Sequence, residues 1–446
     1  MTAAQPPTNQ NTSRLVWSIA LPAMLTNVAT ALFGLADIWV IGRLGDAPAQ
    51  GAVELGAKFM MATLTIFSFL RIGTIALTAQ AAGRGDAQEQ AAALTRSLAA
   101  AIVIGIVILL FKPWVMAAGM AALEAQGEVA RHAHTYISIR YWAGTAWLAN
   151  AVLVGWLIGQ RRVKTVLVVE VLANAVHIAL DVLFVLGFGW GVAGVAWATV
   201  SSEVLKLVLL GGLVALVPAS RLAWASLRHA QTWQTVALKR LFAVNRDLFM
   251  RTLLLTSAIV LFARSGAQQG PVILAANGIL FQIFMLSALI LDGFESSSQV
   301  LCGEARGAND RDRFIRIVRV SLIWGGLSGI IVSAVYALFG PAFVATFSTS
   351  PEVISATSEY MIWVIALPIL GVVSFVLDGV FVGAGWTRAM LITMAAAISA
   401  YCAMIFGMAP LSNAVLWLAF GLFFVARAIG QIALMPRLIR STFSSS

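Results

Sequence analysis

Three polar residues share one stripe of an otherwise apolar stretch, residues 174–184, "NAVHIALDVLF". Asn174, His177 and Asp181 are spaced three and four apart, so a helix places them on one face. An amide, an imidazole and a carboxylate at one place can exchange protons or coordinate a small cation, because all three carry lone pairs and two of them titrate. The meaning of this stripe depends on the medium around the helix, because ionisable groups are costly in an apolar one.

The composition indicates that this medium is a lipid bilayer. Of the 446 residues, 60% are hydrophobic and 11% are charged, with a mean hydropathy of +0.90, whereas a soluble domain has about 25% charged residues. A transmembrane helix needs about 20 mainly apolar residues. The sequence therefore predicts an all-α integral membrane protein with twelve such helices, at 15–41, 53–82, 92–111, 134–160, 165–187, 193–217, 241–264, 272–301, 317–339, 353–383, 388–409 and 412–435.

The basic residues are distributed unevenly between the two sides. With the N-terminus in the cytoplasm, 18 of the 29 Lys and Arg residues fall in inner loops and tails or at the inner ends of segments, and 4 fall in outer loops or at an outer end. This positive-inside pattern predicts a multi-pass membrane protein with both termini cytoplasmic. It also accounts for the net charge of +10 without a nucleic-acid partner.

Two stretches of the chain repeat at nearly one spacing. "GWLIGQRRVK" (155–164) aligns with "GVFVGAGWTR" (379–388) at an offset of 224, and "GRGDAQEQ" (83–90) aligns with "EARGANDRDR" (304–313) at about 222. Each match falls at the same step of a six-helix unit, so we expect two parallel repeats and a transporter with a central cleft between lobes. The expected parts are a disordered tail (1–13), a first lobe (14–217), a basic amphipathic cytoplasmic linker on the bilayer surface (218–240), a second lobe (241–440) and a C-terminal tail (441–446).

Depth in the bilayer groups the polar residues of the first lobe. The first and fifth segments both run outward, and Asp37 and Asp181 lie at similar distances from their outer ends. The sixth segment returns inward and carries Thr199 at a similar depth. Ionisable groups inside a bilayer cost about 2.5–3.5 kcal/mol on insertion scales and tend to be functional. We therefore expect one coupling site in the outer half of the lobe, formed by these residues with Asn174 and His177.

Several roles stay open at this stage. His177 can act as a hydrogen-bond donor that holds Asp181 in position, or it can carry a proton itself. Arg140 can pair with Asp37 or Asp181, or it can extend to the lipid headgroups. Asn150 and Arg140 are the candidate residues for a substrate cleft.

Two other aspartates belong to the second lobe. Asp292 and Asp378 lie on inward-running segments, within two or three turns of the cytoplasmic ends and close to the basic inner loops. Ion pairing or snorkelling at the inner face is therefore favoured over ion transport for this pair.

The chain resembles the multidrug and toxic compound extrusion (MATE) transporters, and in particular their DinF-like branch. The similar stretches are "ALPAMLTNVATALFGLADIWVIGRLG" (20–45), "NAVHIALDVLFVLGFGWGVAGVAWATVSSE" (174–203), "NRDLFMRTL" (245–253) and "ALILDGFESSSQVLCGEARGAND" (288–310). The resemblance implies two six-helix lobes that open as a V, and the export of drugs driven by a cation gradient.

The resemblance also implies roles for single residues. Asp37 and Asp181 match the acids of the first-lobe cation site, and Asn174 and Thr199 match their polar neighbours. Pro22 matches the proline at which the first helix bends, and a proline inside a helix removes a backbone hydrogen bond and favours a kink. The departure is His177, where the family usually has asparagine.

Together with this resemblance, these patterns predict a monomeric transporter of the bacterial inner membrane, not an enzyme. It would expel amphipathic and often cationic drugs in exchange for protons, with sodium as the alternative coupling ion. No cofactor or metal site is expected: no phosphate-binding loop occurs, and Cys302 and Cys402 cannot form a zinc site. Membrane lipids are the other expected partners. The main alternative is a flippase for a lipid-linked or polysaccharide precursor, which would need cationic cleft residues such as Arg71 and Arg140. A membrane-embedded enzyme would have only Asp292 and Glu295 as a polar pair.

Overall fold

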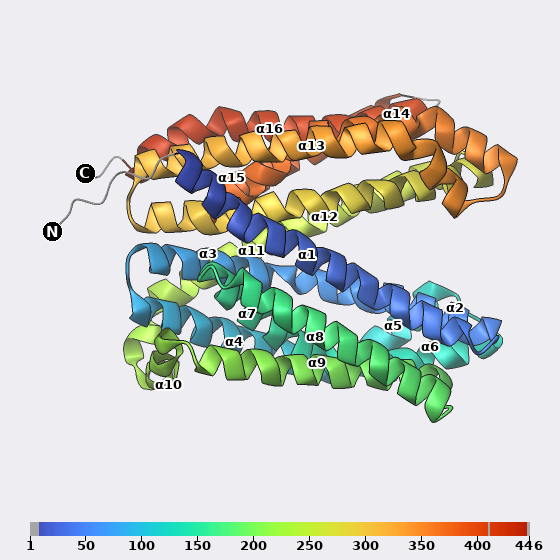
Figure 1. The fold of residues 1–446 in the computed structure, drawn as a ribbon, viewed down its shortest axis with the longest axis horizontal. Helices are drawn as coiled ribbons and strands as arrows, with labels where there is room; N and C mark the ends of the chain where they lie inside the picture. Colours follow the sequence, from blue (N-terminus) through green and yellow to red (C-terminus); the bar gives the residue numbers. More distant parts are fainter. Residues whose placement is uncertain (1–8, 409–410, 444–446) are drawn as a thin grey trace. The chain divides into compact units, whose positions relative to one another are not determined.

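All regular structure in the computed structural model is helical over the residues it describes, 9–408 and 411–443. The helices are labelled in Figure 1, and their bounds are α1 Asn9–Gly42, α2 Ala47–Thr65, α3 Phe69–Gly83, α4 Ala87–Leu110, α5 Lys112–Leu123, α6 Gly127–Arg140, α7 Gly144–Gly159, α8 Val163–Asp181, α9 Gly191–Ala215, α10 Arg221–Arg228, α11 Thr235–Ala267, α12 Pro271–Gly307, α13 Arg311–Phe347, α14 Pro351–Gly383, α15 Thr387–Gly407 and α16 Asn413–Phe443.

Twelve helical spans of the described chain are long and apolar enough to cross a membrane. Three of them are composite. Short 3₁₀ turns at Ile66–Ser68 and Tyr141–Ala143 join α2 to α3 and α6 to α7, and a π-helix at Val182–Gly187 continues α8. Most of the spans clearly exceed the roughly 20 residues that a perpendicular helix needs, reaching 37 residues in α12 and in α13. The predicted class, an all-α multi-pass membrane protein with twelve spanning helices, is confirmed.

The ends and one loop differ from the sequence prediction. The predicted disordered tail covers 1–13, but α1 already begins at Asn9, and residues 1–8 lie outside the described residues. The predicted C-terminal tail from 441 is helical as far as Phe443, and 444–446 lie outside the described residues. The helix α5 lies where an outer loop was expected. Helix α1 extends further because Asn and Gln residues, which lack an apolar signal, still tolerate helical geometry.

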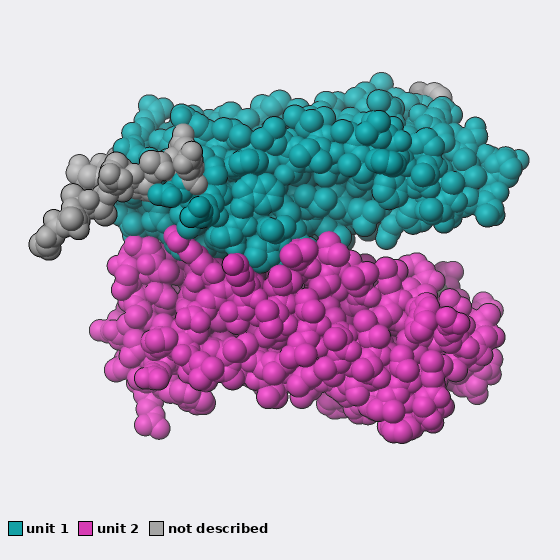
Figure 2. Space-filling view, viewed as in Figure 1, with its two compact units in different colours: residues 1–24, 246–446 teal, residues 25–245 magenta. Residues whose placement is uncertain are grey.

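The chain divides into two compact units, shown in different colours in Figure 2. Unit 2 comprises Leu25–Asn245, and unit 1 comprises the residues up to Met24 together with Arg246–Ser446. The predicted boundaries were 14–217 and 241–440, so the first turns of α1 change sides relative to that expectation. The reason is aromatic packing: Trp17 of α1 contacts Phe294 and Trp324 edge to face, at centroid distances of 5.3 and 5.5 Å. The linker 218–240 groups with unit 2.

Two pairs of turns that correspond in the two repeats have matching backbone hydrogen bonds. Asp86 and Asp310 each donate their N–H to the carbonyl five residues earlier, at 3.0 and 2.9 Å. Their carboxylates then cap the next helix by accepting the N–H three residues later, at 2.8 and 2.9 Å. Arg162 and Trp386, in the second pair of turns, likewise donate their N–H to the carbonyl five residues earlier, at 2.9 and 2.7 Å. The turns at Asp86 and Asp310 are therefore related by an offset of 224, which is the offset of the turns at Arg162 and Trp386 as well. The offset of about 222 assigned to them from sequence is too small.

The same repeat appears in the closest helix packing of each unit. In unit 2, a Cβ on Gly155 or Gly159 of α7 would lie 2.6 Å from the Arg71 carbonyl oxygen or 2.7 Å from the Thr78 Cβ of α3. In unit 1, the corresponding glycines of α14 press against the backbone of α12 at Glu295 and Gln299. Small residues spaced by four allow this approach of two membrane helices. Close packing of this kind holds α7 against α3 and α14 against α12.

Candidate functional site

The predicted stripe of α8 meets α1 inside unit 2, and three titratable side chains come together there. Asp37, His177 and Asp181 are 1%, 0% and 0% exposed. The Nε2 atom of His177 lies 2.6 Å from Asp37 Oδ1 and 3.0 Å from Asp181 Oδ2. Their potential ligand atoms all lie within 4.8 Å of one another. The site therefore places one imidazole nitrogen between two carboxylates, away from water.

The hydrogen-bond count at Nε2 leaves one carboxylate unsatisfied. A ring nitrogen carries at most one hydrogen, and the bond geometry is met toward Asp37. Both oxygens of Asp181 are buried and accept no hydrogen bond from a described residue, although Nε2 is at ion-pair distance. A buried carboxylate without a partner is costly. Asp181 can therefore take up a further proton or a small cation.

The other ring nitrogen limits where protons lie. Nδ1 of His177 is 3.3 Å from Ser202 Oγ, and that hydroxyl also donates to the Thr199 carbonyl at 2.9 Å. When Ser202 donates to Thr199, it accepts from Nδ1–H, and in the neutral ring the lone pair of Nε2 then faces Asp37. A lone pair and a carboxylate at this distance repel each other unless a hydrogen lies between them. At least one proton is thus shared between His177 and the carboxylates in either tautomer.

Aromatic and basic side chains lie close to Asp37 and to the imidazole of His177. Phe33 stacks on the imidazole of His177, with centroids 3.8 Å apart and planes 14° apart. The Tyr136 hydroxyl lies 3.5 Å from Asp37 Oδ2, and Arg140, which contacts that hydroxyl, lies 3.9 Å from the same oxygen. The open question about Arg140 is thereby answered, since its side chain is 17% exposed and turns toward Asp37.

The remaining predicted residues lie near the site but bond elsewhere. Asn174 donates to the Ala29 carbonyl of α1 at 2.7 Å, so it ties α8 to α1. The Thr199 hydroxyl donates to the Val195 carbonyl within its own helix at 3.1 Å. Asn174 therefore bonds outside the cluster, in which His177 and Asp181 come together with Asp37. A direct ligand role for Asn174 or Thr199 stays a prediction.

Asn150, a predicted cleft residue, is enclosed in unit 2. It is 2% exposed, and its amide donates to the Glu203 carboxylate at 2.8 Å and to the Glu203 carbonyl at 2.9 Å. It therefore joins α7 to α9 and does not line an open cleft in this structure. Its predicted contact with substrate stays a prediction.

The helix that carries the site changes its geometry directly after Asp181. Residues Val182–Gly187 form a π-helix, in which hydrogen bonds span five residues; an example is Phe188 N–H to the Leu183 carbonyl, at 2.9 Å. Such wide turns are rare and occur at functional sites more often than elsewhere. The sequence carries no signal for this segment, because its apolar residues suit an α-helix equally well.

A second buried cluster lies in unit 1 and is paired differently. Asp378 of α14, which is 1% exposed, accepts from Arg251 of α11 and from Arg427 of α16. Gln431 also donates to it, at 2.6 Å. The prediction of ion pairing for Asp378 is confirmed, although the pair is buried and does not snorkel to the surface. Asp292 was predicted near the end of its helix, but α12 continues to Gly307 and places it near the middle.

Sequence reasoning missed several partners in both units. Tyr136 and Ser202 have polar groups common enough in membrane helices to give no signal. A signal was present for Arg427 and for the buried pair Glu170–Lys206, because a charge inside an apolar segment is rare. The charged atoms of that pair are 2.6 Å apart. Weighing every intramembrane charge, basic as well as acidic, would have identified them.

Buried titratable groups on membrane-spanning helices are typical of ion-coupled secondary transporters, and comparison with known proteins agrees with that class. The chain belongs to the MatE family, that of the multidrug and toxic compound extrusion transporters, whose model matches residues 22–183 and 248–408. The two matched ranges correspond to the two repeats.

Individual relatives extend this result over nearly the whole chain. The chain is 31% identical over 427 residues to DNA damage-inducible protein F of Escherichia coli (strain K12), covering 96% of this chain and 93% of the relative. It is 22% identical over 337 residues to a probable multidrug resistance protein NorM of Thermotoga maritima, covering 75% and 72%. A crystal structure described as MATE in the bent conformation has a TM-score of 0.85 at 19% identity and covers 97% of both chains.

Proposed function

We propose that this protein exports amphipathic, often cationic drugs across the bacterial inner membrane in exchange for protons, with Asp37, His177 and Asp181 as the coupling site. The observation that carries the proposal is the single Nε2 atom between two buried carboxylates. Family membership and the relative described as a probable multidrug resistance protein support multidrug export.

The proposed cycle follows from the chemistry of the cluster. Protons enter from the outside and load Asp181, whose oxygens accept no hydrogen bond from a described residue. The positive charge of Arg140 stays beside Asp37, because an arginine does not lose its proton at working pH. A cationic drug and a proton then compete for the same negative charge, so that binding of one favours release of the other. Release of the proton to the inside completes the exchange.

A proton fits the site better than sodium does. Sodium is a hard cation that needs several oxygen ligands, and His177 presents a nitrogen where the family usually has an amide oxygen. Imidazole also titrates near neutral pH. The flippase alternative is disfavoured by Arg140, one of its two candidate cations, because this side chain is engaged by Tyr136 and Asp37.

Transport into proteoliposomes tests the coupling ion. Export of a fluorescent lipophilic cation such as ethidium should follow an imposed pH gradient at equal sodium, and a sodium gradient at constant pH should have no effect. The variant His177→Asn should keep transport but shift its pH profile, while His134→Asn, at an exposed histidine of α6, should match the wild type. Transport that follows sodium at constant pH would overturn the proton assignment.

A further inference from the structure

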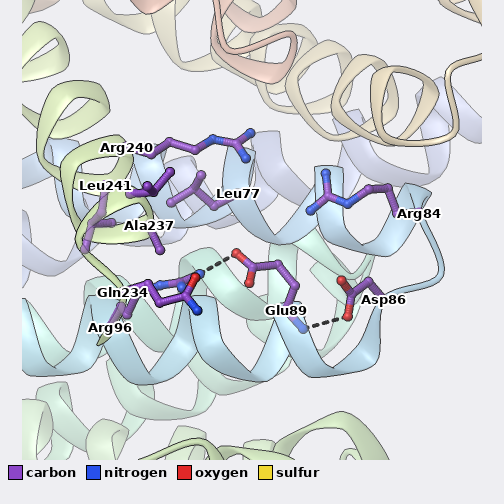
Figure 3. A pocket seen from close by; sticks show the side chains of 10 residues that line it. Leu77, Arg84, Asp86, Glu89, Arg96, Gln234, Ala237, Arg240 and Leu241 are labelled. Atoms are coloured by element: carbon purple, nitrogen blue, oxygen red, sulfur yellow. Dashed lines mark hydrogen bonds and ion pairs between the residues drawn. The ribbon is translucent and has the colours of Figure 1, made fainter. Parts of the chain in front are cut away.

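A pocket of about 320 Å³ lies in unit 2, away from the coupling site. It is lined by the end of α3, the turn Arg84–Asp86, the first turns of α4 and the start of α11, as Figure 3 shows. Gly85 has a positive φ of 69°, which directs the chain sharply at this point. The pocket is therefore built where three helices and the linker meet.

Both acidic groups of the lining are already occupied. Glu89 forms an ion pair with Arg96, which is 4% exposed and forms one wall. Asp86 caps α4 by accepting the Glu89 N–H at 2.8 Å. The same Arg96 donates to the Thr232 carbonyl at 3.3 Å and so holds the linker in place. Both carboxylates therefore already have partners within the chain.

Two arginines at the mouth remain without a negative partner. Arg84 is exposed, and its side chain makes no hydrogen bond or ion pair with a residue of the described chain. Arg240 donates only to the neutral amide of Gln80, at 2.5 Å. Arg84 and Arg96 both repel the Arg240 charge, and Glu89 alone offsets part of this repulsion. Guanidinium groups in this position suit a phosphate oxygen, which they can bind through two hydrogen bonds each.

The pocket also has an apolar side. Leu77 and Leu241 are 8% and 7% exposed and pack with Ala93 into a small core cluster, while Val236 beside them is 78% exposed. Inorganic phosphate would leave this surface bare. A ligand with both an anionic head and an apolar body would cover it.

The linker beside the pocket has the composition of a membrane-surface element. Ser226 of α10 contacts Thr95 of α4 at 2.7 Å, which fixes one face of the helix. Trp224 and Leu227 on other faces are 79% and 45% exposed, and Arg221 and Arg228 flank them. Exposed Trp and Leu with flanking Arg are typical of helices that lie in a lipid headgroup layer.

We propose that this pocket binds the headgroup of an anionic phospholipid from the adjacent leaflet. The lipid phosphate lies between Arg84 and Arg240, and the glycerol and upper acyl chains follow Val236 and Leu241. Basic pockets at the ends of membrane helices bind anionic headgroups in this way. The bound lipid would tie α11 to the α3–α4 turn and so stabilise the linker side of unit 2.

Lipid titration of the purified full-length protein tests this site. The protein, stripped of lipid in a neutral detergent, is titrated with short-chain phosphatidylglycerol, and binding is counted by native mass spectrometry. The double variant Arg84→Gln/Arg240→Gln should bind about 30-fold more weakly, because each arginine near an anionic lipid contributes about 1 kcal/mol. The matched control Arg437→Gln/Arg440→Gln, on exposed arginines at the end of α16, should bind within about twofold of wild type.

Three further arms keep the test decisive. Phosphatidylcholine should bind weakly to wild type and double variant alike, and inorganic phosphate should not compete at millimolar concentration. Arg84→Glu alone should weaken phosphatidylglycerol binding, and the fold is not at risk because Arg84 makes no hydrogen bond or ion pair with a described residue. Equal binding of phosphatidylglycerol by wild type and the arginine variants would overturn the proposal. Competition by inorganic phosphate as strong as by lipid would overturn the lipid assignment.

Discussion

The two units bury carboxylates in opposite ways. In unit 2, Asp37 and Asp181 share one imidazole, a group whose charge changes near neutral pH. In unit 1, Asp378 is held by two guanidinium groups and an amide, whose charges do not change. The first arrangement can exchange protons, whereas the second is fixed. Burial of an acid inside a membrane protein is therefore not enough to indicate transport, because the partner decides what the acid can do.

The repeat relation sharpens this difference. Arg427 occupies the position in the second repeat that Glu203 occupies in the first, so one position carries opposite charges in the two repeats. Glu203 accepts from Asn150 at 2.8 Å in unit 2, and Arg427 donates to Asp378 in unit 1. One fold thus places a polar link between the same pair of helices in both units, and unit 2 also holds the cluster of Asp37, His177 and Asp181.

Removing the titratable acid should give the largest effect. Asp181→Asn should reduce drug export to background, because the amide cannot bind the exchanged proton, while stability stays close to wild type since no hydrogen bond to Asp181 is lost. Export is measured in proteoliposomes, and melting temperature in detergent is the control. Export at the wild-type rate would show that the unit 2 cluster is not the coupling site.

Removing the fixed acid should affect the fold instead. Asp378→Asn removes the carboxylate that pairs with both Arg251 and Arg427, and breaking a buried pair in this way costs about 3–5 kcal/mol. Denaturant titration of the purified protein should show this loss, compared with Asp181→Asn as the matched acid-to-amide change. A variant as stable as wild type would mean that the cluster is solvated and that the contrast between the units fails.

Replacing the proline of α1 should slow drug export. Pro22 lies inside α1, two residues before the division between units at Met24 and Leu25. Pro22→Ala restores a helical N–H and should straighten α1, so that drug still binds but export slows by about tenfold, or about 1.4 kcal/mol in the barrier. Pro341→Ala, at an exposed proline inside α13, is the control. Equal rates for the two variants and wild type would remove the hinge assignment.

The smallest expected effect concerns one position of the repeated turns. Arg161 and Gly385, which correspond in the two repeats, have φ values of 60 and 69°, a region that favours glycine. Gly385→Ala should lower the free energy of unfolding by about 1 kcal/mol, and Arg161→Gly should raise it by up to about 1 kcal/mol. Thermal denaturation of both variants checks the sign. Shifts in the same direction would show that the two turns are not equivalent.

The sequence predicted most of the fold and the centre of the site, for identifiable reasons. Apolar run length determines the twelve spans, and helical spacing places His177 and Asp181 on one face. The orientation of neighbouring helices about their own axes is not encoded in such spacing. Ser202 and Tyr136, which depend on that rotation, could therefore not be predicted as partners of His177 and Asp37. The paired arginines of Asp378 were visible as intramembrane charges, but nothing in the sequence joined them to that aspartate.

The π-helix after Asp181 has a mechanical consequence. A turn closed over five residues holds one residue more than an α-turn, so the segment Val182–Gly187 carries spare chain length. Converting one such turn to α geometry releases a residue and turns one side of the helix against the other by about 100°, with a shift of about 1.5 Å along the axis. Asp181 stands at the start of this segment. Such a conversion would rotate Asp181, a residue of the proposed coupling site, about the helix axis while the backbone hydrogen bonds of the helix are kept.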